Sequence, residues 1–277
     1  MPRLRGVNKL TPRAPYLLKS AAAGDAGVVS HTDDMTEVSI SEYTCGGYYL
    51  ARTAKRADYL TSELLPDQVL SASGCISDFF PGTWAIEWVS DIFEERLKQA
   101  SAFLISEHDL PKVLAWTTAS FSKEFGWPHT FYRLEAARKA RERFVPKVPD
   151  VALFGLGLHL SHTEEFLNEA RSSPHQPECA PAGQTGVFEC VSSGRKITMG
   201  GDVRGFELLV SQHGLLTCSW LCNRLENDCA YRLGIVPNRF GFIQSLDDAR
   251  KCAALISRGE VGAEPGLWLP WLVVSYG

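Results

Sequence analysis

Two short apolar runs set the strongest limit on how this chain can fold. They cover residues 151–158 and 267–274, and each is far shorter than the roughly 20 residues of a membrane-spanning helix. An apolar run of this length without polar alternation is typical of a strand buried on both faces. The sequence therefore predicts a sheet inside a folded protein, with no membrane partner.

Helical periodicity dominates the chain before the first apolar run. Apolar residues recur four apart over residues 81–105, and capping signals mark two further helices at 109–126 and 130–144. Another helix is expected at about 48–60. The pattern therefore predicts an N-terminal half that is helical.

The second half mixes both kinds of element. Strands are expected at 151–158, 186–191, 196–199, 205–210, 240–244 and 267–275, and helices at 161–171, 217–234 and 245–258. Pro270 indicates that the last strand lies at a sheet edge or contains a bulge, because proline donates no ladder hydrogen bond. We expect an α+β fold with a helical N-terminal half. The C-terminal half should hold a mixed, mainly antiparallel sheet with flanking helices.

Three regions follow from this pattern in a chain of 277 residues. Residues 1–36 form a loose basic arm, 37–147 a mainly helical region and 148–277 an α+β region. The prolines near 146–150 either mark a linker or join two layers of one core, so the last two regions are one domain or two. A targeting segment is the alternative interpretation of the arm, because its first 24 residues carry five basic residues and no acidic one.

Composition narrows the classes of partner. The formal net charge of −4 disfavours a nucleic-acid partner. The arm has no apolar segment of the secretory type, so the eight cysteines are expected to be reduced in a cytoplasmic protein. No phosphate loop, dinucleotide glycine motif or zinc-protease helix occurs, so no cofactor is predicted.

Cys45 is the first candidate for chemistry, as the nucleophile of a cysteine-dependent hydrolase or transferase. It precedes the helix expected at 48–60, and a helix N-terminus lowers a thiol pKa. His159 or His162 would act as the general base. Cys75, in Ser-Gly-Cys-Ile-Ser-Asp, is a second candidate for the nucleophile. The alternative is that these residues come together only by chance of composition.

A zinc site is the second candidate. Cys218, Cys222 and Cys229 fall on one face of the helix expected at 217–234, and His213 precedes it. His213, Cys218 and Cys222 would supply imidazole and thiolate ligands to a tetrahedral ion. The alternative is that the thiols pack in the core, because the C-x2-C spacing of most structural zinc sites is missing.

A surface for a protein partner is the third candidate. Trp268 and Trp271, with Glu264, lie among turn-forming residues near the carboxyl end, and large aromatic side chains often anchor interfaces. Core packing is the alternative for the two tryptophans. Arg138, Arg141 and Arg143, on the helix expected at 130–144, form a second candidate surface.

The carboxyl-terminal hundred residues also carry a resemblance. The segments Ser-Trp-Leu-Cys-Asn-Arg-Leu-Glu (219–226) and Val-Gly-Ala-Glu-Pro-Gly-Leu-Trp-Leu-Pro-Trp (261–271) resemble uncharacterised bacterial immunity proteins that accompany toxins. The resemblance implies a cytoplasmic protein that neutralises a toxin by binding it, without a reaction of its own. The sequence thus favours a non-enzymatic protein-binding function, with the Cys45 hydrolase or transferase as the alternative.

Overall fold

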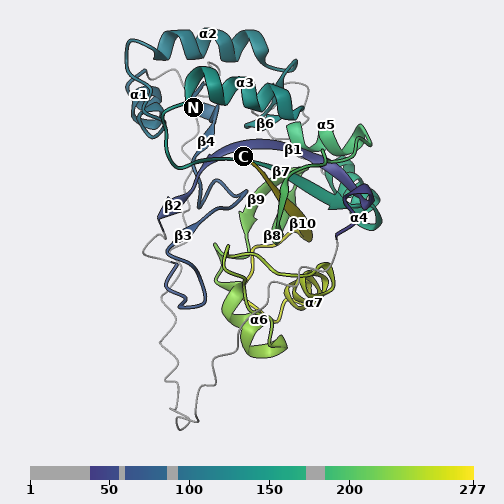
Figure 1. Ribbon diagram of the computed structural model, residues 1–277. Helices are drawn as coiled ribbons and strands as arrows, with labels where there is room; N and C mark the ends of the chain where they lie inside the picture. The colour runs from purple at the N-terminus through teal and green to yellow at the C-terminus, as the bar shows by residue number, and fades with distance from the viewer. Residues whose placement is uncertain (1–37, 56–59, 86–92, 173–184) are drawn as a thin grey trace, which may run out of the picture. The chain divides into compact units, whose positions relative to one another are not determined.

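The computed structural model of the chain describes residues 38–55, 60–85, 93–172 and 185–277 (Figure 1). Internal contacts divide the chain into Met1–Asp34 and Met35–Gly277. All described residues belong to the second unit. The predicted basic arm at 1–36 lies outside them.

The elements are named in chain order. The strands are β1 (Tyr43–Arg52), β2 (Ala54–Lys55), β3 (Gln68–Val69), β4 (Phe79–Phe80), β5 (Phe125–Gly126), β6 (Thr130–Phe131), β7 (Val151–His159), β8 (Asp202–Gln212), β9 (Leu215–Ser219) and β10 (Leu267–Tyr276). The α-helices are α1 (Phe93–Ser101), α2 (Leu110–Ser120), α3 (Leu134–Phe144), α4 (Leu160–Ser172), α5 (Gly186–Ser192), α6 (Leu225–Leu233) and α7 (Leu246–Ser257). Two short 3-10 helices are η1 (Ile40–Glu42) and η2 (Thr83–Ala85).

One large antiparallel sheet organises most of these elements, whereas β2 and β3 pair with each other in a separate small sheet. The strands of the large sheet follow the order β5-β6-β1-β7-β10-β8-β9, and β4 also pairs with β1. The long strands β1, β7, β10 and β8 lie side by side in its middle (Figure 1). Because β9 comes last in the order, it forms an edge of the sheet. The prediction of a mixed sheet confined to the C-terminal half is therefore wrong, because the named strands of this sheet all pair antiparallel and come from both halves of the chain.

Side chains of the sheet are buried on both faces. Along β10, Trp268 and Leu272 belong to one apolar cluster, whereas Leu269 and Trp271 belong to the other. Helices α3, α6 and α7 contribute to the first cluster, and α4 and α5 contribute to the second. This double coverage explains why the strands have continuous apolar sequences.

The N-terminal half is not helical, contrary to the prediction. It contributes the strands β1 to β6 to the described residues, and β1 covers part of the helix expected at 48–60. The pair Gly46–Gly47 forms a bulge in β1, where Gly47 has a φ of +109°. A Cβ atom there would lie 2.1 Å from Cγ2 of Thr130. Glycine therefore permits a close approach of β1 to β6, and the following aromatic residues pair with β7.

Several predicted elements have a different type or extent. Residues 186–191 form helix α5, because the Thr185 side chain caps it by accepting a hydrogen bond from the Phe188 amide. The helix expected at 217–234 is divided into the end of β9, a turn and α6. The stretch 81–105 contains η2 and α1, and its residues 86–92 lie outside the described part.

Other predictions are confirmed. Helices α4 and α7 and strands β7, β8 and β10 lie where the patterns indicated. Helices α2 and α3 are present but shorter than predicted, because residues 125–126 and 130–131 pair with each other as β5 and β6. Ser245 caps α7 by accepting a hydrogen bond from the Asp248 amide. Strand β10 is an interior strand, contrary to the edge predicted from Pro270. It pairs with β7 only from Trp271 onward, so at Pro270 it pairs with β8 alone. No helix in the described ranges is long and apolar enough to span a membrane.

Candidate metal centre

Three cysteines that are distant in the sequence meet at the β9 edge of the sheet. Cys75 lies in the turn between β3 and β4, Cys218 lies near the end of β9, and Cys222 lies in the turn before α6. Their Sγ atoms all lie within 4.8 Å of one another. In the part of the chain that the structure describes, this is the one group of three such side chains close enough to share a metal ion.

Ser73 holds the Cys75 turn against β9. Its hydroxyl donates a hydrogen bond to the Thr217 carbonyl (3.1 Å) and accepts one from the Cys75 amide (3.2 Å). The same hydroxyl lies 3.5 Å from Sγ of Cys222. One buried serine therefore connects the turn, the edge strand and the third thiol.

A buried carboxyl group supports this turn from beneath. Glu207 of β8 is fully buried and accepts hydrogen bonds from the Ser71 hydroxyl (2.5 Å) and the Ala72 amide (2.9 Å). The Ser71 hydroxyl in turn accepts one from the Ser73 amide (3.0 Å). Burial raises the pKa of Glu207 to about 7, against the effect of these donors. The sheet interior thus fixes the backbone that carries Cys75.

The spacing of the thiols suits a tetrahedral metal. Sγ of Cys75 lies 3.9 Å from Sγ of Cys218. Zinc–thiolate bonds of about 2.3 Å at a tetrahedral angle place two sulfur atoms about 3.8 Å apart. A disulfide bond of about 2.05 Å would require the two sulfur atoms to move much closer. The observed separation therefore fits metal ligands without rearrangement of this pair.

The thiols also affect one another's protonation. Hydrogen bonds from the thiols of Cys218 and Cys222 lower the pKa of Cys75. The pKa of Cys218 is raised by its hydrogen bonds to Cys222 and Cys75 and by burial. A proton thus leaves Cys75 first, and its thiolate is stabilised by two donors. A cation bound among the three sulfur atoms would favour further deprotonation.

Cys75 opens onto a cleft of about 620 Å³. The cleft is lined by aromatic rings, among them Phe79, Trp84, Trp127 and His129. The His129 ring stacks on Phe79 with 3.9 Å between centroids, and burial lowers its pKa to about 3. His129 is therefore neutral near pH 7. A small molecule in the cleft would reach Cys75 before the other two thiols, which are not part of the lining.

His213 is not near the cluster. It lies in the turn before β9, at the other end of that strand from Cys218, with its amide donating a hydrogen bond to Glu169 (2.8 Å). The structure thus brings together two of the three residues of the predicted zinc site, Cys218 and Cys222. The third side chain of the cluster is Cys75 instead of the predicted ligand His213.

Cys45 lies within β1 and is 3% exposed, so it has no helix N-terminus beside it. Its Sγ accepts a hydrogen bond from the Gly47 amide (3.3 Å), and burial raises its pKa. His159 and His162 bond instead to Arg250. The arrangement therefore lacks the thiol–imidazole contact that the predicted hydrolase or transferase needs.

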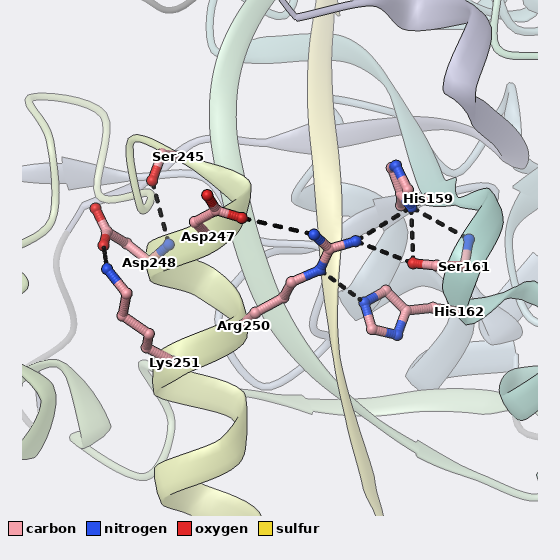
Figure 2. A network of polar contacts seen from close by, with 8 residues as sticks. All are labelled: His159, Ser161, His162, Ser245, Asp247, Asp248, Arg250 and Lys251. Carbon is pink, nitrogen blue, oxygen red and sulfur yellow. Dashed lines mark hydrogen bonds and ion pairs between the residues drawn. The ribbon is translucent and has the colours of Figure 1, made fainter.

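Figure 2 shows where the two histidines point. Arg250 of α7 reaches across to the start of α4, where its guanidinium contacts His159 (3.3 Å), Ser161 (3.0 Å) and His162 (3.4 Å). Asp247 forms an ion pair with the same guanidinium (3.6 Å). Burial, followed by the charge of Arg250, lowers the pKa of His159. This network joins α4 to α7.

The predicted tryptophan surface is buried. Trp271 is 0% exposed and packs edge-on against Phe166, and Trp268 is 3% exposed. The Trp268 indole donates a hydrogen bond to the Glu264 carbonyl (2.9 Å), and Glu264 itself is exposed. Both indoles therefore serve the two core clusters and present no surface to a partner.

The predicted basic surface is mostly accessible. Arg138 and Arg143 of α3 are exposed, and Arg141 is partly exposed. The Arg143 guanidinium lies 4.8 Å from the centroid of the Phe144 ring. These arginines are far along the chain from the thiols, and no described contact joins them to the cluster.

Comparison with known proteins adds no family to this geometry. Protein-family models, curated proteins and solved structures gave no significant match to the chain. The predicted resemblance to immunity proteins stays a prediction.

Proposed function

We propose that the protein binds a thiophilic divalent metal ion, Zn²⁺ in the first place, through Cys75, Cys218 and Cys222. The observation that supports this proposal is the meeting of three Sγ atoms within 4.8 Å at a partly exposed position. Free thiols in proteins are more often buried in the core, where they pack as small apolar groups, as Cys45 and Cys190 do here.

The chemistry of the donors selects the class of metal. Thiolates bind Zn²⁺, Cu⁺ and iron–sulfur clusters, whereas Mg²⁺ and Ca²⁺ require oxygen ligands. Cys218 lies just before a tight turn and Cys222 lies within it, and tight turns are the usual setting of zinc ligands. Three protein ligands leave a fourth tetrahedral position for water or a further ligand.

The bound metal would join separate parts of the chain. Cys75 belongs to the β3–β4 turn, and Cys218 and Cys222 belong to the β9–α6 segment. Hydrogen bonds from Ser73 already hold these segments together. A metal ion would add three coordinate bonds at the same place and so stabilise the folded state.

Metal titration of the reduced, metal-free protein tests this proposal. We expect one Zn²⁺ per chain, and the Co²⁺-substituted protein should show thiolate-to-cobalt charge transfer in its absorbance. Substitution of Cys75→Ser, Cys218→Ser or Cys222→Ser should each weaken Zn²⁺ binding by about 100-fold or more. His213→Ala is the matched control and should bind Zn²⁺ as the wild type does. Wild-type protein that binds no stoichiometric Zn²⁺ would exclude the proposal.

The protein partner stays a separate prediction. It now depends on the exposed groups, Glu264 with Arg138, Arg141 and Arg143, because the two tryptophans are buried. Charge reversal of the three arginines in a folded protein, followed by affinity purification from native cells, tests whether a partner binds there. Retention of every partner by the variant would remove this surface from consideration.

A further inference from the structure

We propose that Cys75 and Cys218 also form a dithiol that a hydroperoxide oxidises to a disulfide. This inference goes beyond the proposed function, although both residues belong to the metal-binding cluster. It concerns the metal-free state, so it does not require that the metal-binding proposal be correct. The oxidised pair would be unable to hold the metal through three thiolates.

Access distinguishes Cys75 from the other thiols. Cys75 is exposed, and the cleft of about 620 Å³ leads to it. Four other cysteines are buried, namely Cys45, Cys190, Cys229 and Cys252. Oxidation by a dissolved hydroperoxide requires contact with the sulfur atom. Among the described cysteines, Cys75 is therefore the first target.

Cys218 is the thiol placed to react next. Its Sγ lies 3.9 Å from Sγ of Cys75, so a bond of about 2.05 Å requires the atoms to approach by about 1.9 Å. Cys75 lies in a turn, and a Cβ atom added at the neighbouring Gly74 would meet nothing within 4 Å. Cys218 lies near the end of the edge strand β9. The exposed Cys75 side chain beside Gly74 therefore has room for this adjustment, and Cys218 lies on an edge strand that pairs on one side only.

Cys222 is held more firmly than Cys218. Its Sγ accepts a hydrogen bond from the Ser219 amide (3.4 Å) and lies 3.5 Å from the Ser73 hydroxyl. Formation of a bond to Cys75 would sacrifice these contacts within a tight turn. The geometry therefore favours the Cys75–Cys218 disulfide and leaves Cys222 as a thiol.

The reaction has two balanced steps. In the first, the Cys75 sulfur attacks one peroxide oxygen, the O–O bond breaks, and Cys75 becomes a sulfenic acid while water leaves after protonation. In the second, the Cys218 sulfur attacks the Cys75 sulfur, the S–O bond breaks, and a second water leaves. Two thiols lose two electrons in total, and H2O2 is reduced to two waters.

Peptide mass spectrometry after treatment with one equivalent of H2O2 tests the proposal on the full-length, metal-free protein. We expect a Cys75–Cys218 disulfide as the major product in the wild type. Cys222→Ser should still form this disulfide although its Zn²⁺ binding is weakened. Cys218→Ser removes the second sulfur, so after H2O2 and dimedone this variant should carry the dimedone adduct on Cys75 and no disulfide at that residue.

Zn²⁺ binding and disulfide formation, measured on the same protein, distinguish the two proposals. A Cys75–Cys218 disulfide in a protein that binds no Zn²⁺ would support the oxidation and exclude the metal site. Stoichiometric Zn²⁺ binding without this disulfide, or a major product at buried cysteines, would overturn the oxidation alone. If both hold, prior loading with Zn²⁺ should slow the oxidation about tenfold or more, because the sulfur electron pairs are coordinated.

Discussion

Cys75 and Cys45 carry the same side chain, but the fold gives them opposite environments. Cys45 is an interior residue of β1, 3% exposed, and burial raises its pKa. Cys75 lies in an exposed turn beside two other thiols, which lower its pKa by hydrogen bonding. A thiol inside a strand behaves as a small apolar group, whereas a thiol among thiols at a sheet edge is a ligand or a nucleophile.

The carboxyl groups show a related contrast. Glu226 of α6 is fully buried, and its Oε2 atom has no hydrogen-bond partner among the described residues. Glu264 is exposed. Exposure and neighbours, rather than residue type, therefore decide which titratable groups of this protein can take part in chemistry.

Alkylation rates give the largest expected difference between Cys75 and Cys45. In the reduced, metal-free protein at pH 7, iodoacetamide should modify Cys75 about 1000-fold faster than Cys45, because only the exposed sulfur is accessible and readily ionised. Timed labelling followed by peptide mass spectrometry measures both rates in one sample. Denatured protein, in which the two rates should converge, is the control. Comparable rates in the folded protein would show that β1 opens easily and that the two thiols do not differ in accessibility.

Zinc binding at the thiol cluster should increase the stability of the folded protein. Free Zn²⁺ at about 100 times its Kd should raise the free energy of unfolding by about 2.7 kcal/mol, and the Tm by about 5–10 °C. Calorimetry with and without Zn²⁺ measures this shift. Cys222→Ser should lose most of it, whereas His213→Ala should keep it. An equal shift in both variants would show that Zn²⁺ stabilises the protein from somewhere other than the thiol cluster.

The buried carboxyl group of Glu226 makes the free energy of unfolding depend on pH with a defined sign. Burial raises the pKa of Glu226 from 4.5 to about 7 in the folded state. Its protonated form therefore favours folding below pH 4.5, and this contribution is lost as the pH rises through 7. Raising the pH from 5 to 8 should therefore lower the free energy of unfolding by about 2 kcal/mol through this group.

Urea unfolding at the two pH values measures this cost. Glu226→Gln cannot ionise, so its stability should fall with pH by about 2 kcal/mol less than that of the wild type. Glu264→Gln, at an exposed position, is the matched control and should follow the wild type. A Glu226→Gln variant with an unchanged pH profile would show that water reaches this carboxyl group.

The sequence predicted those elements whose signals are local. Helix α7 is marked by its Ser245 cap, and β7 and β10 are marked by apolar runs that follow from burial on both faces. Strand β1 was missed because a helix was expected at about 48–60, whereas the Gly46–Gly47 pair forms a bulge and the strand continues through it. The β9–α6 segment was missed because a helical spacing of thiols continued across a strand end and a turn.

The thiol cluster could be predicted only in part. Cys218 and Cys222 were recognised from their spacing, but Cys75 is 143 residues away from Cys218 in the sequence. Only the docking of the Ser73 turn on β9 brings it into place. That docking depends on a buried carboxyl group, Glu207, whose role has no local sequence signal. A single sequence does not reveal long-range pairing of this kind.

The smallest expected effect is on the stability of the metal-free protein when a core thiol, Cys45, or a cluster thiol, Cys222, is replaced. Cys45→Ser should lower the free energy of unfolding by about 1 kcal/mol, because a more polar hydroxyl replaces a thiol that is buried inside β1. Cys222→Ser should change the metal-free protein by less than about 0.5 kcal/mol, since the serine can keep the contacts with Ser73 and the Ser219 amide. Urea unfolding of the metal-free variants measures both values. A larger loss for Cys222→Ser would show that the cluster supports the core even without metal, and the division between core thiols and ligand thiols would fail.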